Sequence, residues 1–184
     1  NKVSYSLVGT GGARDMEGSL PWRLDPAQSG GGLIMDVGCH VIDRIDYICG
    51  PLINVKGKAE NRNSPKIPVE DYVSFTAEVG ATPDSEKKYA VGATVECTWD
   101  FASENESTDE LIFWGDKGSI SLAGMLPDGP ITVRDSDGNE VEKLTFETPQ
   151  HTAQRLIQAT TDDLRGRPRN DFVSVGENAV RASK

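Results

Sequence analysis

The chain has 184 residues, a formal net charge of −10 and a pI near 4.7. This length allows one domain with its own core, and the acidic charge argues against nucleic-acid binding because it repels phosphate backbones. The apolar runs fall far short of the roughly 20 residues that span a bilayer, so we expect no membrane segment. The three cysteines form neither an even set nor a C-x-x-C pair, which predicts free thiols in a reducing compartment, the cytoplasm.

The predicted elements run as a strand, a helix, a series of strands and closing helices. Lys2–Val8 predicts a strand, Thr10–Ser29 a loop rich in Gly, Pro and Asp, and Leu33–Cys49 a helix that stops at Gly50-Pro51. Period-two alternation then predicts seven strands: Leu52–Glu60, Tyr72–Val79, Tyr89–Phe101, Glu110–Trp114, Ser119–Leu122, Ile131–Arg134 and Glu140–Phe146. Gln150–Leu164 and the segment from Ser174 onward predict helices.

Short turns between successive strands favour antiparallel pairing. We therefore expect an α+β fold, with an open, mostly antiparallel sheet and helices on one face. The chain begins at Asn1 directly in strand-like sequence, and its last helix stops without a cap. We interpret residues 1–184 as a single domain taken from a longer protein.

The helix predicted over Leu33–Cys49 carries a polar stripe. Asp36, His40, Asp43 and Tyr47 fall within about 60° of one another. A separate apolar arc must face the core and consists of Ile34, Val37, Val41, Ile45 and Ile48. We expect a mostly buried helix whose polar stripe faces a cleft. A carboxylate four residues from a histidine suits acid–base chemistry, because it can orient the imidazole or raise its basicity. A solvated helix face and a metal held by these two side chains are the alternatives.

Three further motifs have simpler interpretations. Gly30–Gly32 either cradles an anion at a helix N-terminus or forms a tight turn, and the turn is favoured. The segment Gly9–Arg14 fails as a dinucleotide fingerprint, because Arg14 occupies the third glycine position and no helix follows. We therefore expect the chain alone to bind no nicotinamide cofactor.

Asp135–Asn139 imitates the start of a calcium loop, but a type I′ hairpin turn is the better interpretation.

The segment from Trp22 to Gly50 resembles a known family. Pro21-Trp22-Arg23-Leu24, then Gly30-Gly31-Gly32, then Asp36-Val37-Gly38-Cys39-His40-Val41-Ile42-Asp43 and a closing Gly50 are similar to the C-terminal domain of the glucose–fructose oxidoreductase / inositol dehydrogenase / MocA family. The order of the later strands and helices agrees, so the resemblance covers nearly the whole chain.

The resemblance implies the substrate-binding domain of an NAD(P)-dependent oxidoreductase that acts on a sugar, cyclitol or related polyol. His40 would exchange the proton of the reacting group, and Asp36 would orient His40 or hydrogen-bond the substrate. Asp43, Trp22 and Arg23 would contact the substrate. NAD or NADP would be bound mainly by an N-terminal Rossmann domain that this sequence lacks, and no metal is implied. The rival interpretations are a non-enzymatic assembly domain with a vestigial cleft and an unrelated β-rich binding module.

The sheet is also expected to form a homodimer interface. Leu111–Trp114 is apolar on both faces, which predicts burial on both faces. Three helices cover only one face of such a sheet, so a second copy of the chain would cover Trp114. The alternative is that the loop Thr10–Ser29 folds over this patch.

Overall fold

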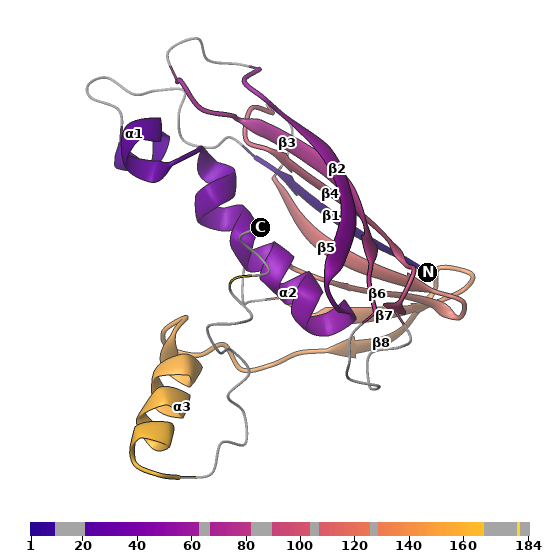
Figure 1. Ribbon diagram of the computed structural model, residues 1–184. Helices are drawn as coiled ribbons and strands as arrows, with labels where there is room; N and C mark the ends of the chain where they lie inside the picture. Colours follow the sequence, from indigo (N-terminus) through magenta and orange to yellow (C-terminus); the bar gives the residue numbers. More distant parts are fainter. Residues whose placement is uncertain are drawn as a thin grey trace.

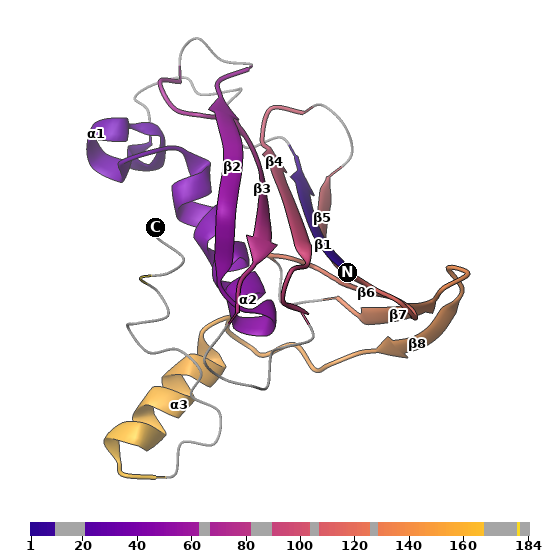
Figure 2. The same ribbon diagram turned by 45° about the vertical axis from the view of Figure 1, so that its right-hand side comes forward.

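The computed structural model has an open, twisted sheet, and the helices of its described residues lie on one side of that sheet (Figures 1 and 2). It describes residues 1–9, 21–62, 67–81, 90–103, 107–125, 129–167 and residue 180. The helical elements are a 3₁₀ turn at Trp22–Leu24, α1 (Pro26–Ser29), a π-helical turn at Ile34–Gly38, α2 (Cys39–Cys49) and α3 (Gln154–Leu164). The strands are β1 (Lys2–Val8), β2 (Leu52–Glu60), β3 (Tyr72–Val79), β4 (Thr94–Asp100), β5 (Thr108–Gly115), β6 (Gly118–Leu122), β7 (Ile131–Asp135) and β8 (Glu140–Leu144).

The predicted α+β class with a mostly antiparallel sheet is confirmed. The eight strands lie in the order β2-β3-β4-β1-β5-β6-β7-β8. Every neighbouring pair is antiparallel except β1 and β4, which run parallel with Tyr5 opposite Cys97. The first strand, β1, therefore lies between β4 and β5 at the centre of the sheet. Pairing of each strand with the next one along the chain would instead have placed β4 beside β5.

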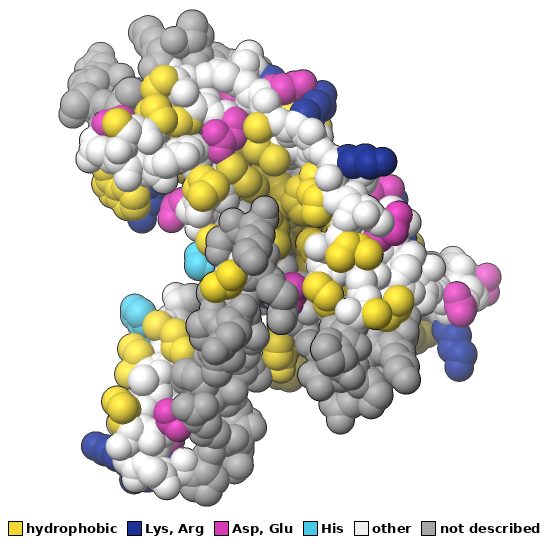
Figure 3. Space-filling view, viewed as in Figure 1, with side chains coloured by type: hydrophobic (Ala, Val, Ile, Leu, Met, Phe, Trp, Pro, Cys, Tyr) yellow, Lys and Arg dark blue, Asp and Glu magenta, His cyan; other side chains and the backbone are white. Residues whose placement is uncertain are grey.

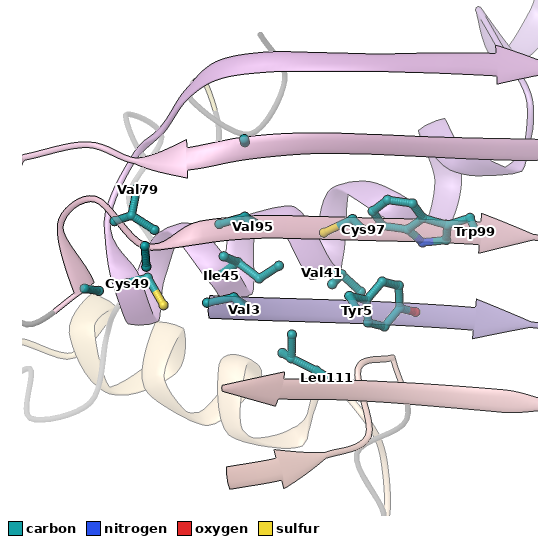
Figure 4. Close-up of a cluster of buried hydrophobic side chains, with 13 residues drawn as sticks. Val3, Tyr5, Val41, Ile45, Cys49, Val79, Val95, Cys97, Trp99 and Leu111 are labelled. Atoms are coloured by element: carbon teal, nitrogen blue, oxygen red, sulfur yellow. The ribbon is translucent and has the colours of Figure 1, made fainter. Parts of the chain in front are cut away.

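The hydrophobic core lies between α2 and the central strands. Figure 4 shows Val41 and Ile45 of α2 over Val3 and Val95 of the sheet, and all four are at most 3% exposed. The alternation predicted for the strand around residue 95 is confirmed, because its core-facing side chains are buried from Ala93 through to Trp99. Burying such a Val or Ile contributes about 1.5–3 kcal/mol each, so this face fixes the position of α2.

Several element boundaries differ from the prediction. The strand predicted to start at Tyr89 starts at Thr94, with a turn over 90–92, and Tyr89 itself lies outside the described residues. The helix predicted from Gln150 starts at Gln154, after turns over 150–153. The described part of the predicted loop Thr10–Ser29 contains the 3₁₀ turn and α1, which Asp25 caps by accepting the Ala27 N–H at 3.0 Å. The helix predicted from Ser174 lies outside the described residues, apart from Val180.

The β7–β8 hairpin is confirmed, but its predicted type I′ turn is wrong. Gly138 N–H donates to Asp135 O at 3.1 Å, and Gly138 has φ +86°. Ser136 and Asp137 do not have the positive φ that type I′ requires. The Asp135 carboxylate accepts hydrogen bonds from the side-chain amide and backbone N–H of Asn139 and from the backbone N–H of Asp137, and these bonds hold the pKa of Asp135 below its usual value. The Asp135 carboxylate therefore stabilises this hairpin turn.

Candidate functional site

The predicted site is built on the start of the long helix. The predicted α-helix over Leu33–Cys49 opens instead with a wider π-helical turn, and regular α-helix begins only at Cys39. Gly38 is buried where the two meet, and a Cβ there would overlap the side chain of Ile34. Turns of this kind are common at functional sites. Asp36 thus lies in the π turn, whereas His40 and Asp43 lie in α2.

Three of the five predicted site residues come together at this turn. The Arg23 Nε–H donates to Asp36 Oδ2 at 2.7 Å. The Arg23 guanidinium also lies 4.6 Å from the centre of the Trp22 ring. Trp22 and Arg23 belong to the 3₁₀ turn, which precedes the π-helical turn in the chain. The ion pair between Arg23 and Asp36 therefore holds the 3₁₀ turn against the π-helical turn. Both ion-pair partners are about half exposed, which leaves them accessible to a ligand.

The Asp36 carboxylate is hydrogen-bonded to Arg23 and not to His40 in the described part of the chain. Asp36 and His40 nevertheless lie one turn apart, with His40 exposed and Asp43 partly buried. Within the stripe, His40 and Tyr47 are exposed, whereas Asp36 and Asp43 are only partly so. That the polar stripe faces a cleft stays a prediction.

The glycine turn before the helix is occupied by the chain's own carboxylate. Gly32 N–H donates to Glu70 Oε1 at 2.9 Å, and a Cβ at Gly32 would lie 2.6 Å from the Glu70 backbone oxygen. The close-approach interpretation of Gly30–Gly32 is therefore the one that the structure supports. Sequence reasoning did not include Glu70, because it comes 38 residues after Gly32 and belongs to no motif.

A second polar cluster, also absent from the sequence analysis, ties α2 to the sheet. Arg44 Nη1 donates to Ala123 O at 3.0 Å and also to Gly124 O. Asp109 accepts the Tyr5 hydroxyl at 3.1 Å and the Gly124 N–H at 3.0 Å. Burial and the Asp109 carboxylate together raise the pKa of Tyr5 far above its usual value, so this hydroxyl stays protonated. No sequence spacing signals the cluster, because its members come from four distant segments.

The cysteines do not offer an activated nucleophile. All three are free thiols. Burial raises the pKa of the Cys97 thiol to about 12, which opposes formation of a reactive thiolate. Cys39 is partly buried and its sulfur donates to Asp36 O at 3.5 Å. Within the described residues, no group of three or more His, Cys, Asp or Glu side chains is placed to hold a metal ion.

Comparison with known proteins identifies the family. The profile of the GFO/IDH/MocA C-terminal domain matches residues 6–121, more than half of the chain. The chain belongs to this family. It is also 30% identical over 139 residues to Oxidoreductase P35 of Formosa agariphila, covering 76% of this chain and 38% of that protein. The resemblance carried by the segment from Trp22 to Gly50 is thereby confirmed.

Solved structures share the fold at low sequence identity. An aldose-aldose oxidoreductase from Caulobacter crescentus, complexed with glycerol, matches with a TM-score of 0.69 and 18% identity over 98% of this chain and 49% of its own. A biliverdin reductase from Synechocystis sp., in complex with biliverdin and NADP+, matches with a TM-score of 0.67 and 15% identity over 98% of this chain and 51% of its own. The chain thus spans about half the length of these structures and less of the curated relative. None of the helices that the structure describes is long and apolar enough to cross a bilayer.

Proposed function

We propose that this chain is the substrate-binding half of an NAD(P)-dependent oxidoreductase that acts on a sugar, cyclitol or related polyol. One observation carries the proposal: in a member of an oxidoreductase family, Asp36 of the π-helical turn and His40 at the start of α2 lie one turn apart, with Asp36 partly exposed and His40 exposed. The length of the matching proteins supports a further domain, since this chain covers about half of the structures. The aldose activity named for one of them supports the substrate class.

Two glycine-rich segments of the chain do not suit a dinucleotide. A pyrophosphate is usually held by free N–H groups of a glycine-rich turn at a helix N-terminus. Here the Gly32 N–H is already bonded to Glu70, and a glycine fingerprint fails at Gly9–Arg14. We therefore assign NAD or NADP to a Rossmann domain of the parent protein, where its nicotinamide would accept or donate the hydride.

His40 is the proton-transfer residue of the proposal. An imidazole has one nitrogen that accepts a proton and one that donates it, so His40 can take the proton of a reacting hydroxyl or return it to a carbonyl oxygen. Arg23 and Asp36 form a donor–acceptor pair one turn away, which suits the vicinal hydroxyls of a polyol. Trp22 extends this surface beside Arg23, as an apolar face for a sugar ring. Asp43, in the next turn of α2, assists the proton transfer by His40.

A second copy of the chain is the proposed partner on the other face of the sheet. Trp114 is 47% exposed on that face, and its Nε1–H donates to Ser4 Oγ at 3.1 Å. The side chains facing the same way on β1 and β4 include Ser4, Ser6, Thr94 and Thr98, and Lys2 and Glu96 form an ion pair there at 2.7 Å. A two-fold related copy can match such a self-complementary surface. We place the parent protein in the cytoplasm, where its free thiols stay reduced.

The test is turnover of the parent protein on a panel of aldoses, cyclitols and polyols with NAD⁺ and NADP⁺. His40→Ala should lower kcat by about 10²-fold or more, the usual contribution of a general acid–base group. His151→Ala is the matched control, because it removes the other histidine of the chain from an exposed position and should leave kcat unchanged. Equal activities of the two variants would remove His40 from the chemistry. Absence of hydride transfer with every substrate would favour the assembly-domain alternative.

A further inference from the structure

An apolar cleft lies on the helix-bearing side of the sheet, away from the proposed site. Its cavity has a volume of about 740 Å³, and it extends from the C-terminal end of α2 over β5, β6 and β7. The apolar side chains that line it include Ile48, Phe113, Ile120, Leu122, Ile131 and Val133. The strand register places Ile120 opposite both Phe113 and Val133, so these three share the face that α2 covers elsewhere. Ile120 is nevertheless 43% exposed.

The helix α3 has an exposed apolar face of its own. It contains no buried residue, although Leu156, Ile157 and Leu164 are 56%, 59% and 83% exposed. At 100° per residue these three side chains fall on one face, and Arg155 lies on the opposite one. Figure 3 shows hydrophobic side chains along one edge of α3, at the lower left of the view. A helix with such a face is stabilised mainly by packing that face against another surface.

The chain connection brings these two surfaces within reach of each other. β8 ends at Leu144 and α3 begins at Gln154, so residues 145–153 connect them. Nine residues span up to about 30 Å when extended. β6 lies two strands from β8, a separation of about 10 Å. Both α2 and α3 lie on the same side of the sheet in both views (Figures 1 and 2).

We propose that α3 docks into this cleft of its own chain through Leu156, Ile157 and Leu164. The structure shows the undocked arrangement. Docking would cover Ile120 and Phe113 and bury the apolar face of α3 in one step. The tether favours the chain's own helix over any free partner, because a short connection gives an effective concentration on the order of millimolar. The mainly apolar lining suits a helix face better than a polar ligand. This inference does not rest on the proposed function.

Disulfide trapping tests the docked arrangement in the full chain. Ile120→Cys combined with Ile157→Cys pairs the cleft with the apolar face of α3. Ile120→Cys combined with Arg155→Cys is the matched control from the opposite face. Both pairs are made in a Cys39→Ala, Cys49→Ala background, because Cys49 lines the cleft and Cys39 is only partly buried.

Under mild oxidation we expect an intramolecular disulfide in the Ile157 pair to form about tenfold faster than in the control, because docking holds residue 157, and not residue 155, against residue 120 while the tether is the same in both pairs. Mass spectrometry and non-reducing gels give the rates. Equal rates in both pairs, no disulfide in either, or disulfide-linked dimers alone would overturn the proposal, and dimers would assign the cleft to a second copy.

Hydrogen exchange provides a second measurement that does not depend on introduced thiols. Leu156→Asp should accelerate amide exchange across β6 relative to Arg155→Asp, because only the first change removes the docking face. Circular dichroism confirms that both variants keep the fold. Identical exchange in β6 for the two variants would contradict docking.

Discussion

The cluster around Asp109 gives the sharpest test of how the sheet holds the loop after β6. Asp109 accepts the Tyr5 hydroxyl at 3.1 Å, the Gly124 N–H at 3.0 Å and, through Oδ2, the Met125 N–H at 2.9 Å. Asp109→Ala leaves all three donors without this acceptor. A buried donor without a partner costs about 1–3 kcal/mol. Tyr5 and Gly124 are buried, whereas Met125 is partly exposed and regains water. We therefore expect a loss of about 2–6 kcal/mol in the free energy of unfolding.

Two reference variants separate this effect from a general sensitivity of β5. Tyr5→Phe removes one donor and leaves the other two bonded, so we expect a loss of about 1 kcal/mol. Glu110→Ala changes the exposed neighbour and should stay within about 0.5 kcal/mol of the parent. Urea unfolding followed by circular dichroism gives all three values, and a common m-value would show that the denatured state is unchanged. A loss for Asp109→Ala no larger than that for Tyr5→Phe would refute the reasoning.

The remaining predictions concern a buried thiol and the outer face of the sheet. Burial raises the pKa of Cys97 from 9.0 to about 12, so the folded state keeps a proton that the unfolded chain loses, and stability should fall as pH rises from 9 toward 12. Cys97→Ala should reduce this slope by up to about 1.4 kcal/mol per pH unit, measured by urea unfolding between pH 8 and 10.5, and an unchanged slope would contradict it. Trp114→Arg should convert a dimer to a monomer in light scattering, and a parent chain that is itself a monomer at tens of micromolar would count against the sheet interface.

Sequence alone determined the elements that depend on short-range periodicity. The bounds of β1, β2 and β3 agree with prediction, because alternation over seven to nine residues specifies a strand. The alternating side chains are buried on one face in β1 and β3, whereas β2 contains no buried residue. The apolar arc of α2 identified Val41 and Ile45 as core residues for the same reason. The Trp22-Arg23 and Asp36–His40 motifs identified the family, since they are contiguous patterns of residue type.

Only the tertiary structure decided which distant segments meet. The parallel pairing of β1 with β4 joins residues more than 90 positions apart, and periodicity carries no information on the strand that lies alongside. The pairing of Asp36 with Arg23, and not with His40, depends on how the 3₁₀ turn closes onto the π-helical turn. Local patterns specify which face of an element is buried. Its neighbours are chosen by the packing of the whole chain, which is where the site, the Asp109 cluster and the cleft beside α2 are formed.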